Sequence, residues 1–545
     1  MKKFYLSTLI IISSLISNAQ TWNWAVDIGR WYGTETALVK TNDAGDIFTA
    51  GTFTGNATVG DTSWYQDTTD ANNRAIYVAR LTSDNHTIWA ELIDGNNTTL
   101  WDMAVDSNNT TYVLGFYAVN LIFSDTTIGD TGTISGAYIA AFDSSGNRLW
   151  LQLIDSVANF GNYLSLDTNG DLIYATYSWG SGTFTIRKIS HVTGNILWEQ
   201  DYPLTYFGGE FLRLHGIVVT SGNEIYVTGS VESDTLHFNS VTYSQDSMYK
   251  YISFTAKFND ASGALQNVEI VNGAVIEEMD IDAADNFYLL GHFGKAIQVR
   301  QIFLPVDTCM ENNCEEYFLA KLNTTNTASW VRPYTDDQVS SQHIDVSDAG
   351  NIYYTASVFT DSLVFDNVIL VEDTTRAFTA VVKFDTNGMA MWGTKDAGGY
   401  QSGTAPLDIA FSESGSIAIT GHFHHFFAQS WFGNDTLPYT WIHSHLFLAS
   451  MTDNDIVTEA GNIANINSGF AIYPNPNNGT FTIHFNSKPS DAHVIVHDVL
   501  GNIIWNSFSA KEQEKVVHFE SLSKGIYFIE ALYGNQRFMR KIAVQ

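Results

Sequence analysis

A short strand-like phrase recurs seven times along the 545 residues of this chain. In each copy, an apolar run rich in β-branched and aromatic residues ends in Gly or another small residue. The copies end at Gly51, Gly115, Thr176, Gly229, Gly291, Ala356 and Gly421, which lie 64, 61, 53, 62, 65 and 65 residues apart. A repeat of this length is typical of architectures in which each unit covers the apolar face of the next. The repeat constrains the fold strongly but selects no function by itself.

The segment at 342–397 shows the content of one repeat most clearly. HIDVSDAG alternates apolar and polar residues before an Asp/Gly turn, which is typical of a half-buried strand. NIYYTASVF follows as a β-branched and aromatic strand, and SLVFDNVILV is typical of a hairpin that turns at Asp366 and Asn367. A further strand, a Thr-Asn-Gly turn and a strand with a tryptophan complete the repeat. Several strands per repeat and no helical segment predict an all-β fold.

The tryptophan strand of the repeat has a register of its own. Its positions are Trp24, Trp89, Trp150, Trp198, Gln266 in place of a tryptophan, Trp330 and Trp392. The chain opens on this strand, whereas the last repeat, at 404–453, has no such strand after it. A ring needs matching ends, and closure removes exposed strand edges. The phase therefore predicts a seven-bladed β-propeller closed by the N-terminal strand.

The repeats resemble those of secreted bacterial β-propeller proteins. The shared pattern is D-x-x-G-N-x-Y-V-x-G-x-F, then F-V-A-K-hydrophobic-D-x-x-G, then W, and it extends over nearly all of 22–453. The resemblance implies a propeller fold and leaves the ligand open.

The N-terminus has the parts of a secretion signal. Lys2 and Lys3 precede an apolar run, and small residues lead to a cleavage position between Ala19 and Gln20. The run is short for a membrane span, and no later stretch reaches about 18 apolar residues, so no transmembrane segment is predicted. We expect residues 1–19 to be removed and the rest to be secreted or held at the outer cell surface.

The formal net charge is −32, from 26 basic and 58 acidic residues. Nucleic-acid binding needs a basic surface, so the charge argues against that class of partner. Residues 467–545 hold 7 basic and 6 acidic residues, so the acidic excess lies before them. This shift predicts a separate C-terminal domain.

Cys309 and Cys314 are the two cysteines of the chain. In an exported protein, a close and even pair most simply forms a disulfide. A redox or metal role is disfavoured because the spacing is not C-x-x-C and no further Cys or His ligands lie nearby in the sequence. We therefore predict a disulfide between Cys309 and Cys314.

The last segment combines turn signals with strands of period two, which predicts a small Ig-like β-sandwich. Four motifs follow one another there: YPNP-x-x-G, D-x-x-G, L-x-x-G-x-Y and a terminal lysine. Their residues are Tyr473, Pro474, Asn475, Pro476, Gly479, Asp498, Gly501, Leu522, Gly525, Tyr527 and Lys541. The segment closely resembles the C-terminal sorting domain of the type IX secretion system of Bacteroidetes. The resemblance implies export by the type IX machinery and attachment to the cell surface, with recognition and folding roles for these residues.

Histidines gather in two segments of the last repeat. His422 and His424 share one face of GHFHHFF as a strand, and His443 and His445 share one face of WIHSHLF. If the two strands pair, four imidazoles converge as a metal site of nitrogen ligands. The alternative, which we favour, is that they are ordinary polar residues of an aromatic-rich sheet. No metal or other cofactor is predicted.

The predicted domains are a signal peptide at 1–19, a propeller at 20–453, a linker at 454–468 and a sorting domain at 469–545. Because no catalytic motif occurs, the first hypothesis is a noncatalytic surface protein whose propeller binds a glycan or protein ligand. The alternative is a secreted carbohydrate-active enzyme with acidic residues in the propeller funnel, because funnel residues come from different blades and have no fixed spacing.

Overall fold

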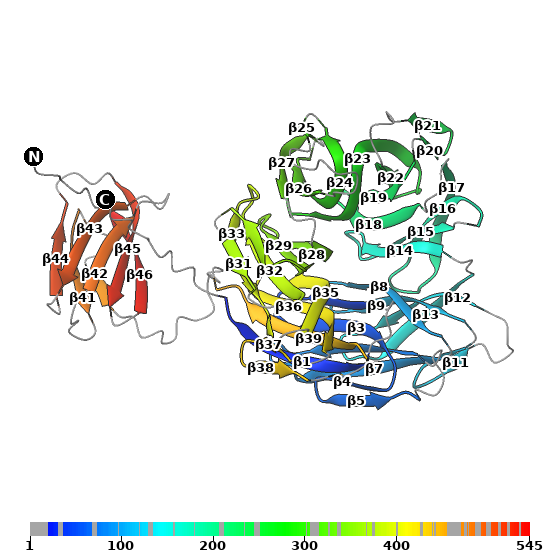
Figure 1. The fold of residues 1–545 in the computed structure, drawn as a ribbon, viewed down its shortest axis with the longest axis horizontal. Coiled ribbons are helices and arrows are strands. Elements are labelled where there is room, and N and C mark those ends of the chain that lie inside the picture. Colours follow the sequence, from blue (N-terminus) through cyan, green and yellow to red (C-terminus); the bar gives the residue numbers. More distant parts are fainter. Residues whose placement is uncertain are drawn as a thin grey trace, which may run out of the picture. The chain divides into compact units, whose positions relative to one another are not determined.

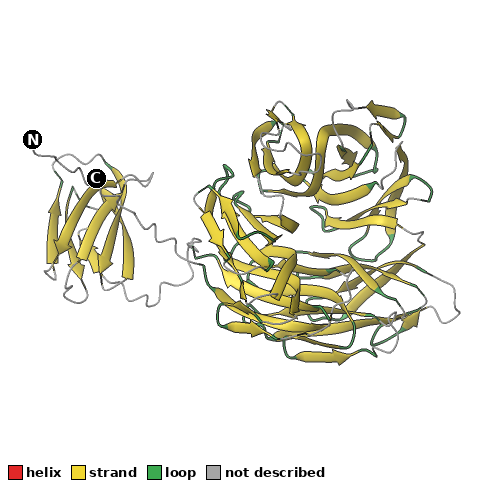
Figure 2. Cartoon of the chain, in the orientation of Figure 1, coloured by secondary structure: helices red, strands yellow, loops and turns green. Residues whose placement is uncertain are grey.

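The computed structural model describes residues 20–454 and 470–544, apart from short internal gaps. The gaps are 31–35, 68–73, 96, 119, 129–134, 156–158, 179, 207–211, 234, 245–250, 301, 306–315, 325–326, 335–338, 367, 373–375, 399–401, 426–428, 439, 441–442, 474–476, 478, 486–491, 498–502, 511–513, 520–523 and 534–535. All secondary structure in the described residues is β (Figure 2), which confirms the all-β prediction. The chain divides into two compact parts, at residues 1–457 and 458–545.

Strands of the first part pair in antiparallel sets of four, and each set is called a unit below. Unit 1 is β2 (Ala37–Thr41), β3 (Ile47–Phe53), β6 (Ala75–Leu81) and β7 (Thr87–Gly95). Unit 2 is β8 (Thr99–Val105), β9 (Thr111–Tyr117), β12 (Gly136–Phe142) and β13 (Arg148–Asp155). Unit 3 is β14 (Asn159–Leu166), β15 (Leu172–Ser178), β16 (Thr183–Ile189) and β17 (Ile196–Tyr206).

Units 4 and 5 share one long strand. Unit 4 is β18 (Arg213–Val219), β19 (Glu224–Val231), β22 (Ile252–Asn259) and the first half of β23 (Leu265–Ile281). Unit 5 is the second half of β23 with β24 (Phe287–Val299), β26 (Glu316–Leu322) and β27 (Ala328–Tyr334). Unit 6 is β28 (Val339–Val346), β29 (Ile352–Val358), β32 (Phe378–Phe384) and β33 (Ala390–Lys395).

The N-terminal strand completes unit 7. This unit is β35 (Ser402–Phe411), β36 (Ser416–His425), β39 (His445–Thr452) and β1 (Trp22–Arg30). β1 pairs antiparallel with β39 along most of its length, with Ala25 opposite Ala449 (Figure 1). The last repeat therefore obtains its fourth strand from the start of the chain, as the tryptophan phase predicts.

Short hairpins lie outside the sets of four. β4 (Asn56–Val59) and β5 (Thr62–Tyr65) extend unit 7 next to β1. β10 (Leu121–Ile122) and β11 (Thr127–Ile128) extend unit 1, and β20 (Thr235–Phe238) and β21 (Val241–Ser244) extend unit 3. The remaining short strands are β25 (Ile302–Pro305), β30 (Ser362–Phe365), β31 (Val368–Val371), β34 (Ala397–Gly398), β37 (Ser430–Phe432) and β38 (Asp435–Leu437).

The hydrophobic core lies between the sheets. Each core cluster of the first part combines buried residues of two consecutive units, so each sheet covers the apolar face of its neighbour. One cluster joins units 7 and 1, with Ala418 and Leu448 packed together with Val39 and Tyr77. The first strands follow the same order, because each one contacts the first strand of the next unit and β35 contacts β2.

The register corrects one position of the tryptophan series. Each tryptophan of the last strands lies opposite the same position of the third strand, as Trp198 does opposite Lys188 and Trp330 opposite Lys321. In unit 4, this position of the third strand is Lys257, and its partner is Asn267. Asn267, rather than Gln266, therefore stands where the other units have a tryptophan.

The second part consists of two antiparallel sheets that share one core. One sheet is β40 (Phe470–Tyr473), β41 (Thr480–Phe485) and β44 (Glu514–His518). The other is β43 (Ile503–Ala510), β42 (Ala492–His497), β45 (Gly525–Tyr533) and β46 (Gln536–Val544). Buried residues of both sheets, among them Phe481, Val496 and Ile529, form a single cluster.

Candidate functional site: a carboxylate-lined cavity

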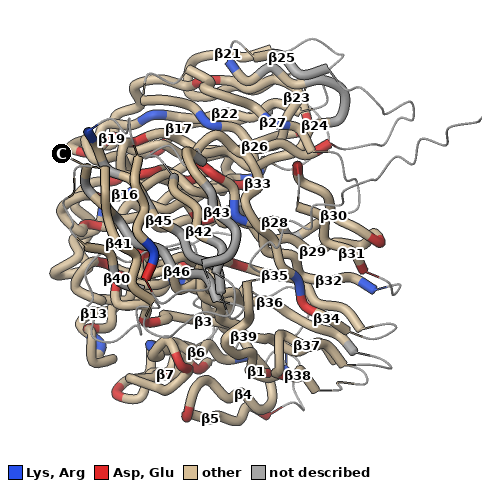
Figure 3. Tube along the Cα trace, turned by 90° about the vertical axis from the view of Figure 1, so that its left-hand side faces the viewer, with Lys and Arg blue, Asp and Glu red and all other residues tan. Residues whose placement is uncertain are grey.

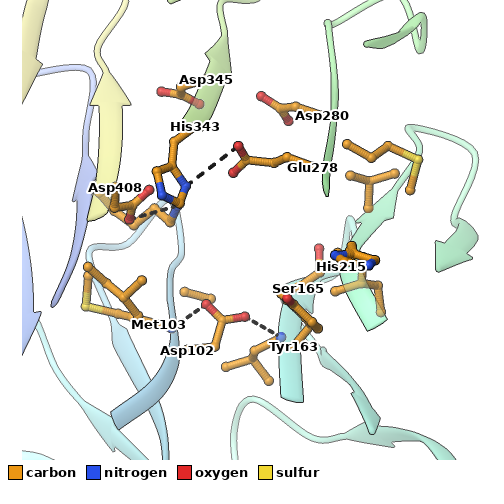
Figure 4. Close-up of a pocket in the computed structure, with 18 of the residues that line it drawn as sticks. Asp102, Met103, Tyr163, Ser165, His215, Glu278, Asp280, His343, Asp345 and Asp408 are labelled. Carbon is orange, nitrogen blue, oxygen red and sulfur yellow. Dashed lines mark hydrogen bonds and ion pairs between the residues drawn. The ribbon is translucent and has the colours of Figure 1, made fainter. Parts of the chain in front are cut away.

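The first strands of all seven units line a cavity of about 590 Å³, drawn in Figure 4. These strands are β2, β8, β14, β18, β23, β28 and β35. The ionisable residues that line the cavity are Lys40, Asp102, His215, Glu277, Glu278, Asp280, His343, Asp345 and Asp408. Acidic groups outnumber cationic ones, so the cavity favours hydroxyl and cationic ligands over anions.

Five of the carboxylates bind the backbone of the next unit. In each contact a backbone N–H donates to a carboxylate oxygen. The donor and acceptor pairs are Leu164 and Asp102 Oδ2 (2.6 Å), Ile344 and Glu278 Oε2 (2.7 Å), Val346 and Asp280 Oδ2 (2.8 Å), Phe411 and Asp345 Oδ2 (2.5 Å), and Val39 and Asp408 Oδ2 (2.9 Å). Each donor lies on the first strand of the following unit, where an unpaired buried N–H would be costly. The cavity carboxylates therefore hold neighbouring first strands together.

Asp280 and Asp345 have unusual acidities. Burial raises the pKa of Asp345 to about 8, and repulsion from Asp280 adds to the rise while Lys40 opposes it. Burial likewise raises the pKa of Asp280 to about 6, with repulsion from Glu278 in the same direction. Asp345 therefore keeps its proton to a higher pH than an ordinary aspartic acid does.

One lysine and one histidine stand among these acids. Lys40 Nζ lies 3.9 Å from Asp408 Oδ2, and this carboxylate holds the pKa of Lys40 above its usual range although burial opposes it. His343 Nδ1 lies 3.8 Å from Glu278 Oε2, and the two side chains point toward each other in Figure 4. Burial lowers the pKa of His343, but Glu278 and other nearby acids outweigh burial and raise it.

A second histidine lies on β18. His215 Nε2 is 2.6 Å from Ser230 Oγ, and burial lowers the pKa of His215 to about 4. His215 is therefore neutral at pH 7. On the neighbouring unit, Glu277 Oε1 is 2.9 Å from His292 Nδ1.

The histidine segments of unit 7 do not build the hypothetical four-imidazole site. β36 and β39 do pair, but Phe423 lies opposite His445. Side chains alternate along a strand, so His422 and His424 lie on the face opposite to His445. His445 instead contacts Asp27, with 3.0 Å from Nδ1 to Oδ1. Within the described ranges, no three His, Cys, Asp or Glu residues are grouped closely enough to hold a metal ion.

Several predicted site residues lie outside the described residues. These are Ala19, Cys309, Cys314, Pro474, Asn475, Pro476, Asp498, Gly501 and Leu522, and the side chain of Lys541. Of the others, Gln20 is buried, and its Oε1 accepts a hydrogen bond from Asn454 Nδ2 at 2.9 Å.

The described sorting-motif residues occupy turn, surface and core positions. Gly479 has φ +93°, a conformation that favours glycine, and its N–H donates to Asn477 Oδ1 at 2.8 Å. The Tyr473 hydroxyl donates to Glu514 Oε1 at 3.0 Å on the surface, whereas Tyr527 lies in the core. Gly525 is the first residue of β45.

The C-terminal part has a recognisable family. Residues 471–545 match the family described as secretion system C-terminal sorting domain. This segment is a secretion sorting domain. The match confirms the resemblance to type IX sorting domains and indicates export toward the outer surface through that machinery. The described residues contain no helix that could cross a membrane.

The first part has distant structural likenesses. The Dos1 propeller matches with 11% identity and a TM-score of 0.38, over 80% of this chain and 95% of that one. A Dyadobacter fermentans protein of unknown function matches with 7% identity and a TM-score of 0.37, over 80% and 99%. The polysaccharide lyase Uly1 matches with 10% identity and a TM-score of 0.39, over 78% and 92%. Likenesses this weak assign neither a ligand nor a reaction. The chain has no significant sequence match among curated proteins.

Proposed function

We propose that this protein is an exported surface module whose first part is a seven-bladed β-propeller that binds a glycan or protein ligand without transforming it. In this proposal the seven units are the blades, and β1 closes the ring by pairing with β39. The shared core of units 7 and 1 and the contact of β35 with β2 support the ring. The signal peptide is cleaved between Ala19 and Gln20, and the sorting domain directs type IX export and surface attachment.

The observation that carries the binding role is the use of the cavity carboxylates. Asp102, Glu278, Asp280, Asp345 and Asp408 each accept a backbone N–H of the next first strand. These contacts fix the carboxylates against the first strands, so they present a preorganised acidic lining to a bound ligand. The carboxylates can still accept further hydrogen bonds, which favours a ligand rich in hydroxyl or cationic groups.

The acidic composition of the chain agrees with this ligand class. Asp and Glu residues, red in Figure 3, are spread over strands and turns of the described trace. The net charge of −32 disfavours nucleic acids and anionic polysaccharides through long-range repulsion. Neutral glycans and basic protein segments remain as partners of the cavity.

A secreted carbohydrate-active enzyme is the second candidate. It is favoured by the raised pKa of Asp345, because a carboxyl group that keeps its proton near neutral pH can act as a general acid. Glu278, beside His343, would then supply the second carboxylate.

The two candidates separate in one experiment on the mature chain. We expect retention on an array of neutral glycans, loss of retention in Asp408→Ala, and no release of reducing ends from any bound polysaccharide. Asp43→Ala, on an exposed turn, is the matched control and should bind like the wild type. Release of reducing ends that disappears in Asp345→Asn would overturn the binding role in favour of the enzyme.

A further inference from the structure

The tryptophans of the last strands seal the contacts between neighbouring units. Four of the six indole N–H groups donate to a turn carbonyl of the next unit: Trp24 to Ser83 (2.8 Å), Trp150 to His191 (2.8 Å), Trp198 to Asp260 (2.7 Å) and Trp330 to Thr386 (3.1 Å). Those of Trp89 and Trp392 are buried and have no hydrogen-bond partner among the described residues. In each case the acceptor turn follows the third strand of the next unit. The same hydrogen bond therefore recurs in four of the seven units.

Glycines in these turns show how completely the indoles fill the space. A Cβ on Gly194 would lie 2.6 Å from the ring of Trp150, and one on Gly263 would lie 2.5 Å from Trp198. Both glycines have positive φ, which lets the turn come close to the ring. Little room is left for a ligand at these contacts.

Unit 4 lacks this seal, because Asn267 holds the tryptophan position. A cavity of about 340 Å³ lies there, lined by Tyr226, Thr255, Lys257, Gln266, Asn267, Glu269 and Thr324. Thr324 follows the third strand of unit 5, as Asp260 follows that of unit 4, so its carbonyl is the acceptor that an indole would use. The cavity is therefore the space that a tryptophan fills elsewhere.

The charged groups of this cavity are already neutralised. Lys257 Nζ lies 2.6 Å from Glu224 Oε1. Glu269 forms an ion pair with Arg300, and its Oε1 also accepts a hydrogen bond from Asn267 Nδ2 at 3.1 Å. An ionic ligand would have to compete with these pairs, whereas a neutral one would not.

The other lining groups suit a ring with several hydroxyls. Gln266 and Asn267 provide amides, and Thr255 and Thr324 provide hydroxyls, so donors and acceptors surround the cavity. Tyr226 provides an aromatic side chain, held by an edge-to-face contact with Phe287 at 4.7 Å between ring centroids. The volume falls within the range of small-molecule pockets, which begins at about 300 Å³.

We propose that the cavity at Asn267, between units 4 and 5, is a binding site for a neutral hexopyranose ring. The site is separate from the central cavity, with which it shares no lining residue. An exported protein of this construction holds two independent ligand positions, and the second one exists because one tryptophan is absent.

The test uses the mature chain and ligand-observed NMR with glucose, galactose and mannose. We expect weak binding of at least one of these hexoses, and a loss of about tenfold or more in affinity in Asn267→Trp, whose indole fills the cavity. Val192→Trp is the matched control, because it adds an indole on an exposed turn and should bind as the wild type does. Thermal unfolding establishes that both variants are folded.

Two further measurements keep the test decisive. If Asn267→Trp does not fold, Thr255→Val removes one hydroxyl with little change in size and should weaken hexose binding. Glucosamine and glucuronate should bind no more tightly than the neutral hexoses, because Lys257 and Glu269 are paired. The proposal is overturned if none of the three hexoses binds, if a charged sugar binds about tenfold more tightly, or if the folded cavity variant keeps wild-type affinity. Hexose binding that remains in Asp408→Ala and is lost when Asn267→Trp is added to it belongs to this cavity rather than to the central one.

Discussion

At the scale of single residues, carboxyl groups of the central cavity both hold neighbouring strands together and have raised pKa values. Asp345 accepts the Phe411 N–H at 2.5 Å, so it holds β35 against β28. Burial and the neighbouring Asp280 also raise its pKa to about 8. The group that joins two units is therefore also one whose charged form is disfavoured by burial in the folded state.

The pH dependence of stability follows from this shift. A carboxyl whose pKa is raised on folding stabilises the protein below its unfolded pKa, and this contribution is lost as the pH rises through the folded pKa. For Asp345 the loss runs from about pH 4 to about pH 8. We expect the unfolding free energy of Asp345→Asn relative to wild type to rise by about 4 kcal/mol between pH 5 and pH 9, because the wild type loses about 1.4 kcal/mol per pH unit up to about pH 8.

Thermal or denaturant unfolding at the two pH values measures this difference. Asp43→Asn, on an exposed turn, is the control and should show the same stability relative to wild type at both. An Asp345→Asn variant whose relative stability is equal at pH 5 and pH 9 would contradict the assignment.

Sequence reasoning identified the repeat but missed the cavity acids. Glu278, His343 and Asp408 are 65 residues apart, as are Asp280 and Asp345, so the period could have placed them on one rim. In other units the same position is occupied by Tyr163 and Gly216. Because these residues are chemically unlike the acids, the shared position could not be recognised from the sequence. Which acid gains a raised pKa depends on burial between units, which no local pattern contains.

At the scale of elements, the hairpin predicted at Asp366 forms, but the sheets that the hairpins join were not predictable. Asp366 has φ +49° at the turn between β30 and β31, as the Asp-Asn signal indicates. The hairpin β20–β21, however, joins β17 of the preceding unit instead of its own sheet. Local turn chemistry fixes a hairpin, whereas its docking depends on the free sheet edge that the preceding unit presents.

The cysteine pair gives a test at this scale, although it lies outside the described residues. Because Cys309 and Cys314 are close in sequence and the protein is exported, we expect them to form a disulfide with each other. Alkylation of the denatured, unreduced protein should leave both residues unlabelled, and reduction before alkylation should label both. Mass spectrometry of the peptide that contains them reads the result. Labelling of both cysteines without reduction would contradict the prediction.

At the scale of the whole molecule, the last unit of the first part is completed by a strand that is remote from it in sequence. Trp24 donates its indole N–H to Ser83 of unit 1, while its own strand belongs to unit 7. The N-terminal strand thus connects the last unit to the first through both hydrogen bonds and core packing. The tryptophan phase predicted this exchange, because a missing last strand and a surplus first one require each other in a ring.

The measurement that tests ring closure most directly is an engineered disulfide between β1 and β39. Ala25 lies opposite Ala449, and its N–H donates to Asp435 Oδ2 at 3.0 Å instead of to β39. This is a non-hydrogen-bonded pair, whose Cα atoms are about 4.5 Å apart and suit a disulfide. Ala25→Cys with Ala418→Cys is the control, because Ala418 lies on β36, beyond β39.

The proposed closure by β1 predicts that Ala25→Cys/Ala449→Cys forms the bond without added oxidant in the folded protein. The bond should raise the unfolding temperature, and reduction should reverse the gain. The control pair should remain as free thiols. Free thiols in the folded Ala25→Cys/Ala449→Cys protein, or equal cross-linking in the control, would contradict a propeller closed by its N-terminal strand.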